Sequence, residues 1–144
     1  MFIGEYNHNL DSKGRIIIPS KFRDALQSTF ILTRGLDGCL AIYSNEQWEN
    51  IINRLSKLPS TKKAVRQYIR MMTAKACECV LDNQGRIQIP AFLASDVNII
   101  KECSIVGAND HIEIWDRETW NRYFDEAGES FEEVAEELSE LMTE

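Results

Sequence analysis

The chain has 144 residues, of which 44% are hydrophobic and 27% are charged, which is the composition of a soluble globular protein. Its longest unbroken aliphatic run, Ile16 to Ile18, is far too short to span a membrane, and the first residues lack the basic start and apolar middle of a signal peptide. We therefore expect a cytoplasmic protein with no membrane partner.

The net charge of −7 is distributed unevenly along the chain. Residues 1–75 hold twelve Lys/Arg and six Asp/Glu, a charge of +6, whereas residues 76–144 hold four and seventeen, a charge of −13. Much of the acidic excess is terminal, because residues 125–144 carry nine acids and no base. The overall charge therefore does not exclude a nucleic-acid partner, since local fields govern such contacts.

Hydrophobic periodicity predicts seven elements in the first half of the chain. The first two strands are expected to pair as a hairpin across a turn at residues 11–14, and Ser20 is expected to cap the helix that follows. A capping box at residues 44–47 opens a later helix, which Pro59 stops. The elements are strands at 4–10 and 15–18, a helix at 20–27, strands at 30–34 and 39–43, and helices at 44–58 and 65–72.

The second half is predicted to repeat this order. Its elements are strands at 74–81 and 86–89, a helix at 91–96, strands at 103–106 and 112–115, and helices that begin after Asp116 and Ser130. The fold class is therefore α+β, with the order β-β-α-β-β-α-α used twice. We divide the chain into units 1–72 and 73–144, the second ending in an acidic helix, and we expect intimate packing because each unit is too small for a generous core of its own.

One stretch makes the repeat explicit. Asp11 to Pro19 returns as Asp82 to Pro90, with six identities in nine positions at an offset of 71 residues. Both copies read Asp-x-x-Gly-Arg-Ile-x-Ile-Pro.

Each copy has the chemistry of a tight turn between strands. Glycine, here Gly14 and Gly85, supplies a positive φ, and aspartate, here Asp11 and Asp82, accepts hydrogen bonds from the amides of the turn. We therefore predict two hairpin tips, with Arg15 and Arg86 at the mouths of the strands.

A search for catalytic chemistry finds little. No nucleophile elbow or glycine-rich phosphate loop is present, and the two histidines, His8 and His111, lie in strand-like alternation, which favours a structural role. The four cysteines lie in β-like runs without a Cys-x-x-Cys pair, so we expect reduced core thiols rather than a metal site. The prediction is a protein that is not an enzyme and that has no cofactor and no metal.

Nucleic-acid binding fits better. A two-stranded ribbon fits the major groove of DNA, and an arginine on such a ribbon can donate two hydrogen bonds to guanine. Arg15 and Arg86 are placed for this role, and Lys13 would meet phosphate, whereas the second tip has Gln84 instead. An alternative stays open, in which each arginine only forms a turn-closing bridge with its own aspartate.

Two charged helices are open to similar alternatives. The basic helix, with Lys62, Lys63, Arg66 and Arg70, adds phosphate contacts or is a solvated face. The acidic final helix docks on a neighbouring subunit, repels DNA from the wrong face, or is merely solvated.

The chain resembles the MraZ family of bacterial transcriptional regulators. The resemblance rests on the opening Met-Phe-Ile-Gly-Glu-Tyr, on Leu10 to Ile16 with Pro19, and on Leu81 to Ile87 with Ile89 and Pro90. It covers nearly the whole chain, and the family signature Asp-x-x-x-Arg stands twice, as Asp11/Arg15 and Asp82/Arg86.

The resemblance implies two tandem swapped-hairpin β-barrel domains of the AbrB/SpoVT type and a ring-shaped homo-oligomer associated with the nucleoid. Its tips would bind short direct repeats in double-stranded DNA upstream of its own operon, the division and cell wall cluster, usually to repress it. By this resemblance Arg15, Arg86 and Lys13 are DNA contacts, while Asp11, Gly14, Asp82 and Gly85 shape the tips. The rival hypothesis is a non-catalytic oligomeric scaffold or an antitoxin-like partner, which would show no operator preference at all, whereas DNA binding through the tips predicts an affinity that falls steeply as salt rises.

Overall fold

The computed structural model describes residues 1–143, so Glu144, the last residue of the predicted second unit, lies outside the described residues. The predicted order β-β-α-β-β-α-α occurs twice, as expected. The first seven elements are β1 (Glu5–Asn9), β2 (Arg15–Ile17), α1 (Ser20–Leu26), β3 (Phe30–Arg34), β4 (Leu40–Ser44), α2 (Asn45–Ser56) and α3 (Lys63–Ala74). The next seven are β5 (Cys77–Cys79), β6 (Arg86–Gln88), α4 (Ala91–Asp96), β7 (Glu102–Gly107), β8 (Ile112–Asp116), α5 (Arg117–Glu129) and α6 (Phe131–Met142).

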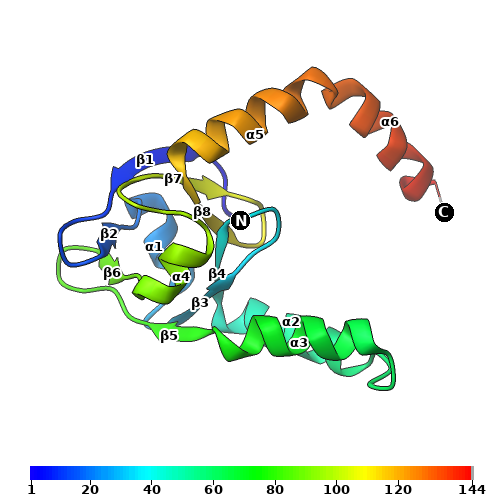
Figure 1. Cartoon of the computed structure of the whole chain (residues 1–144), viewed down its shortest axis with the longest axis horizontal. Coiled ribbons are helices and arrows are strands. Elements are labelled where there is room, and N and C mark those ends of the chain that lie inside the picture. Colours follow the sequence, from blue (N-terminus) through cyan, green and yellow to red (C-terminus); the bar gives the residue numbers. More distant parts are fainter. Residues whose placement is uncertain (144) are drawn as a thin grey trace.

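The strands form two antiparallel sheets that mix the two repeats. The larger sheet has six strands in the order β1-β7-β8-β4-β3-β5, and the smaller one pairs β2 with β6. Thus β1 of the first repeat joins β7 of the second, and β5 of the second joins β3 of the first. The repeats are consequently one body, in which each half completes the other's sheet (Figure 1).

The predicted pairing of residues 4–10 with 15–18 as a hairpin is wrong. The turn between them forms, because the amide of Asp11 donates to the carbonyl of Arg15 at 2.9 Å, but the chain then diverges. Strand β2 pairs with β6 so that Ile16 faces Ile87, and burying these two side chains together outweighs pairing with the nearest strand in sequence. Local turn chemistry therefore does not select the partner of a strand.

Two smaller expectations also change. Residues 74–81 were expected to form one strand, but the chain stays helical through Ala74 and the strand is limited to β5. Ser20 is not a cap: Pro19 occupies the N-cap position of α1, and no side-chain cap bond is present there. By contrast, Ser44 caps α2 as predicted, since its hydroxyl oxygen accepts from the amide of Gln47 at 3.2 Å.

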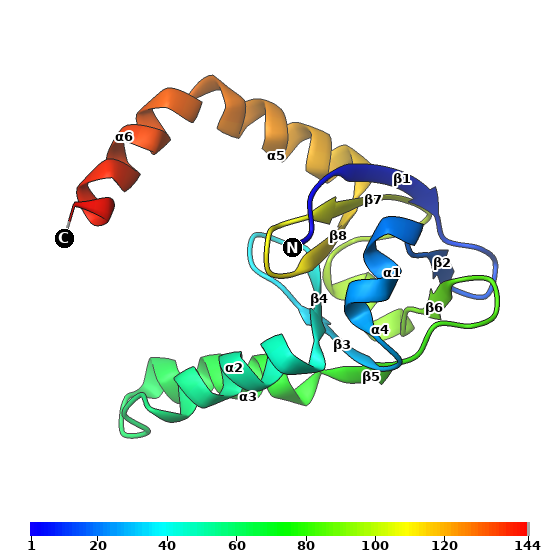
Figure 2. The ribbon, with the colours of Figure 1, turned by 180° about the vertical axis from the view of Figure 1, so that it is seen from behind.

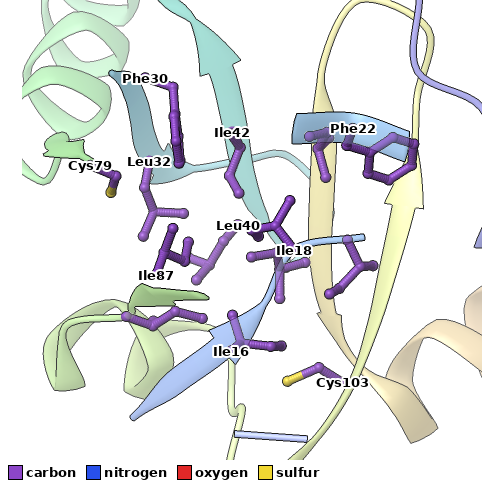
Figure 3. Packing of buried hydrophobic residues seen from close by; sticks show 14 of the residues in the cluster. Ile16, Ile18, Phe22, Phe30, Leu32, Leu40, Ile42, Cys79, Ile87 and Cys103 are labelled. Carbon is purple, nitrogen blue, oxygen red and sulfur yellow. The ribbon is translucent and has the colours of Figure 1, made fainter. Parts of the chain in front are cut away.

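One large hydrophobic core holds the two repeats together. It lies between the two sheets, with α1 and α4 closing its sides, and both repeats contribute buried side chains to it (Figure 3). Ile16 and Ile18 from the first repeat and Ile87 and Ile89 from the second are each at most 2% exposed. The labelled residues that meet there include Phe22, Phe30, Leu32, Leu40, Ile42, Cys79 and Cys103.

The longer helices extend from this body as two arms (Figures 1 and 2). Helices α2 and α3 make one arm, and α5 with α6 makes the other, while the β1–β2 and β5–β6 loops lie at the opposite end. Among the described residues, no helix is long and apolar enough to cross a membrane.

The four cysteines are free thiols, as predicted. Cys39, Cys79 and Cys103 are buried, and burial raises the pKa of the Cys79 and Cys103 thiols to about 11. Thiols with such pKa values are poor nucleophiles at neutral pH.

His111 is held between two carboxylates and is stacked on Tyr43. Its Nε2 lies 3.0 Å from Glu113 Oε2, its Nδ1 lies 2.7 Å from Asp110 Oδ1, and the two ring centroids are 5.2 Å apart. The hydrogen bond with Glu113, assisted by Asp110 and opposed by burial, raises the pKa of His111 above its ordinary 6.5.

This environment predicts that stability depends on pH. Because the pKa of His111 is higher in the folded chain, its contribution is complete below pH 6.5 and is lost as the pH rises through the folded-state pKa. We expect the urea midpoint to fall between about pH 6 and about pH 9, and His111→Phe, which keeps the stacking on Tyr43, to flatten this dependence. An unchanged slope in the variant would contradict this assignment.

Candidate nucleic-acid interface

The first tip is organised by the carboxylate of Asp11. Its Oδ1 accepts from the amides of Lys13 and Arg15, each at 2.9 Å, and its Oδ2 accepts from Arg15 Nε at 2.8 Å. The amide of Gly14 donates to the carbonyl of Asp11 at 3.0 Å, and Gly14 has φ of 76°. Gly14 is thus required for its backbone conformation, and Asp11 both closes the turn and orients Arg15.

The second tip has the same bonds in the same places. Asp82 Oδ1 accepts from the amides of Gln84 and Arg86 at 2.9 Å, and its Oδ2 accepts from Arg86 Nε at 2.8 Å. Gly85 has φ of 74°, and its amide donates to the carbonyl of Asp82 at 3.0 Å. The repeated residues therefore fold into two equivalent turns.

Both aspartates are held in the charged form. For Asp11, the hydrogen bond from the backbone amide of Arg15 makes the largest contribution to lowering the pKa of the carboxyl, and the Arg15 side chain lowers it further, against a desolvation effect that raises it. The same causes lower the pKa of Asp82, with Arg86 in place of Arg15. Each turn is consequently closed by a carboxylate at neutral pH.

The two tips lie together at one end of the molecule. The β2–β6 pair joins their bases, with Arg15 opposite Gln88 and Ile17 opposite Arg86. Arg86 Nη1 lies 3.7 Å from Asp11 Oδ2, so the second arginine also reaches the first tip's carboxylate. The result is a pair of loops that extend from the end of the body opposite the helical arms (Figure 2).

The geometry leaves part of each guanidinium available at the surface. The side chains of Arg15 and Arg86 are 31% and 22% exposed, and the contacts within 3 Å use only their Nε atoms. The turn-closing bridges of the alternative hypothesis are therefore present. They do not exclude recognition of a base, because a guanidinium held through Nε can still present its two Nη groups to an acceptor pair.

The residues around the arginines differ between the tips. Lys13 and Gln84 occupy equivalent positions and are both exposed. The basic residues of α3 lie on a helical arm, away from the tips (Figure 1), and Arg66 Nη1 donates to the carbonyls of Ser60 and Thr61, which closes the α2–α3 loop.

Two residues at the tips were not identified from the sequence. Arg23 of α1 donates from Nε to the carbonyl of Ile18 at 2.8 Å, beside the second tip, and Gln88 Nε2 donates to the carbonyl of Lys13 in the first tip. Comparing the repeats position by position would have singled them out, because Gln88 replaces Ile17 within the repeated stretch and Arg23 is replaced by Ala94 beyond it. Within residues 1–143, no group of three or more His, Cys, Asp or Glu side chains is arranged to hold a metal ion.

A comparison with protein-family models supports the division into two repeats and shows the family to which the chain belongs. The model described as "MraZ protein, putative antitoxin-like" matches residues 1–71 and again residues 72–141. The two matches cover nearly the whole chain and each contains one tip. The chain therefore belongs to the MraZ family.

Proposed function

We propose that this protein is a sequence-specific DNA-binding transcriptional regulator. The observation that carries the proposal is the pair of identical Asp–Arg turns, joined at their bases by β2 and β6 and exposed at one end of the molecule. Two loops from a β-ribbon can enter the major groove, where Arg15 and Arg86 would each donate to guanine O6 and N7. Lys13 would contact phosphate beside the first tip.

The strand exchange supports the swapped-hairpin barrel of the AbrB/SpoVT type. In such a barrel the strands that flank each turn pair with the other half rather than with one another, which is the pattern of β1 with β7, β2 with β6 and β3 with β5. In this chain the exchange takes place between the two repeats of one molecule.

We further propose that the chain assembles into a homo-oligomeric ring. Helix α6 exposes an apolar stripe of Phe131, Val134, Leu138 and Leu141 and carries only acidic charge. The α2–α3 arm is basic and exposes Tyr68 and Met71, which line a hollow of about 240 Å³ with Leu36. Docking α6 of one copy on α3 of the next would be a head-to-tail contact, which closes into a ring when the rotation permits.

A ring would present many tips to DNA that carries repeated sites. Each tip binds weakly on its own, but tethering in one assembly raises the effective concentration of the others. By family membership the target would be short direct repeats upstream of the protein's own operon, the division and cell wall cluster, with repression as the outcome and the nucleoid as the place of action.

The test is a binding titration with the chain's own upstream DNA and with a scrambled duplex of equal length, each at several salt concentrations. We expect preference for the native sequence and an affinity that falls linearly on a log–log salt plot, with a slope of about −0.9 for each phosphate neutralised. Equal, weak binding to both duplexes would contradict the proposal.

The second candidate is a non-catalytic scaffold or antitoxin-like partner. It is favoured by the closed Asp11–Arg15 and Asp82–Arg86 pairs, which stabilise turns without DNA, and by the family description. It predicts no operator preference in the titration at any salt concentration.

A further inference from the structure

The two tips differ in what supports them. At the 71-residue offset, Arg23 in α1 corresponds to Ala94 in α4, and Ile17 in β2 corresponds to Gln88 in β6. These positions flank the turns on the side of the short helices, so each tip rests on a different set of side chains although the turns themselves are alike.

Arg23 supports the second tip. Its Nε donates to the carbonyl of Ile18 at 2.8 Å, and the amide of Ile18 donates to the carbonyl of Gly85 at 2.9 Å. The guanidinium lies against Gly85 so closely that a Cβ added there would overlap the guanidinium carbon. One half-buried side chain thus spans α1, the end of β2 and the second turn.

The first tip has the equivalent bond from the amide of Ile89 to the carbonyl of Gly14, also at 2.9 Å, but no guanidinium packs against its glycine. Ala94 is too short to reach it, and no other described residue donates a hydrogen bond to the carbonyl of Ile89, the counterpart of Ile18. A cavity of about 630 Å³ opens beside this turn, and its lining includes Lys13, Gln88, Ala94 and Ile89. The amide of Gln88, which is exposed, covers Gly14 and donates to the carbonyl of Lys13.

We propose that Arg23 is a positioning residue that holds the second tip in its DNA-binding conformation, while the open cavity at Ala94 leaves the first tip adjustable. The expected effect on DNA binding rests on the proposed function, whereas the positioning of the second tip rests on the contacts of Arg23. The charge-assisted bond of Arg23 fixes Ile18, whose amide in turn bonds Gly85, and such a bond is stronger than the one that the neutral, exposed amide of Gln88 makes to Lys13. The guanidinium also fills the space into which the second turn would otherwise move.

A rigid second tip and an adjustable first tip suit a protein that binds several DNA sites at once. A tip that is already ordered binds without a further ordering cost, whereas an adjustable tip pays that cost but tolerates small differences in spacing and DNA shape. Arg86 would then read its base from a fixed position. Arg15, assisted by Lys13, would adapt to the neighbouring site.

Amide hydrogen exchange without DNA tests the structural half of the proposal. In the wild type we expect the turn amides of Gln84 and Gly85 to exchange more slowly than those of Lys13 and Gly14. Arg23→Ala should accelerate exchange at the second tip by roughly three- to tenfold and leave the first unchanged. The double variant Gln88→Ile/Ala94→Arg, which copies the Ile17/Arg23 pair, should slow exchange at the first tip.

Binding to the upstream DNA tests the functional half. Arg23→Ala should weaken affinity by up to the same factor, because only the ordered fraction binds, but its salt slope should match the wild type because no phosphate contact is lost. Arg23→Lys separates positioning from charge: lysine keeps the charge but lacks the flat guanidinium, so it should restore neither protection nor affinity. Wild-type behaviour of Arg23→Lys, or a reduced slope in Arg23→Ala, would overturn the proposal.

The two failures are distinguishable. If the protein has no operator preference, the wild type and the variants will bind the native and scrambled duplexes equally, while the difference in amide exchange between the two tips remains. If the tips exchange equally in the wild type and in Arg23→Ala, the positioning role is refuted even when DNA binds normally.

Discussion

Replacing Arg15 with alanine is expected to abolish the preference for the upstream sequence while leaving the fold intact. A bidentate arginine–guanine contact contributes about 1–3 kcal/mol of discrimination, and the loss would recur at every first tip of the proposed ring. The substitution removes a side chain that is 31% exposed and its bond to Asp11, but the turn keeps the bonds from the amides of Lys13 and Arg15 to Asp11 Oδ1. The measurement is the ratio of affinities for native and scrambled duplexes, with size-exclusion chromatography to verify the assembly.

Matched variants separate base reading from charge and from turn closure. Arg15→Lys keeps the positive charge without the planar fork, so we expect weak binding to persist and the preference to disappear. Lys13→Ala should weaken binding to all sequences and reduce the salt slope by about one. The loss of preference in Arg86→Ala, compared with that in Arg15→Ala, measures the contribution of the second tip relative to the first. Arg86→Ala also removes the 3.7 Å contact with Asp11.

One result would show that the two arginines have a structural role rather than a DNA-binding one. If Arg15→Ala and Arg86→Ala both bind DNA as the wild type does, the Asp–Arg pairs serve only to close the turns. The scaffold or antitoxin-like candidate would then be preferred.

Substituting Ile87 with alanine should destabilise both repeats at once. Ile87 is 2% exposed and lies opposite Ile16 at the centre of the β2–β6 pair, where truncation of a buried isoleucine costs about 2–5 kcal/mol. That is a large part of the stability of an ordinary domain. Because one core contains side chains from both repeats, we expect a single urea transition that moves as a whole.

Ile17→Ala is the control, because Ile17 is a neighbour of Ile16 in β2 but is 39% exposed. It should change the free energy of unfolding by no more than about 0.5 kcal/mol. Both variants should be compared at one protein concentration, since assembly shifts apparent stability. Two separate transitions in Ile87→Ala, one for each repeat, would refute the shared core.

Local sequence signals account for the elements and for the shape of the tips. The helices and strands follow hydrophobic periodicity over a few residues, and Ser44 and Asp116 cap their helices through bonds to amides three residues ahead. The turn at Asp11 likewise depends on contacts within five residues. Interactions of such short range join residues that are close together in the sequence, so they can be predicted from the sequence.

The partners of the strands and the support of the tips depend on contacts between residues far apart in the chain. The repeat makes β2 an equally plausible partner for β1 or for β6 on pattern alone, and the burial of Ile16 against Ile87 selects β6. In the same way, Arg23 has the appearance of an ordinary charged helix residue until folding brings it against Gly85, sixty-two positions away. The physical reason is that burial and packing are properties of the assembled core, whereas periodicity and capping are properties of a few adjacent residues.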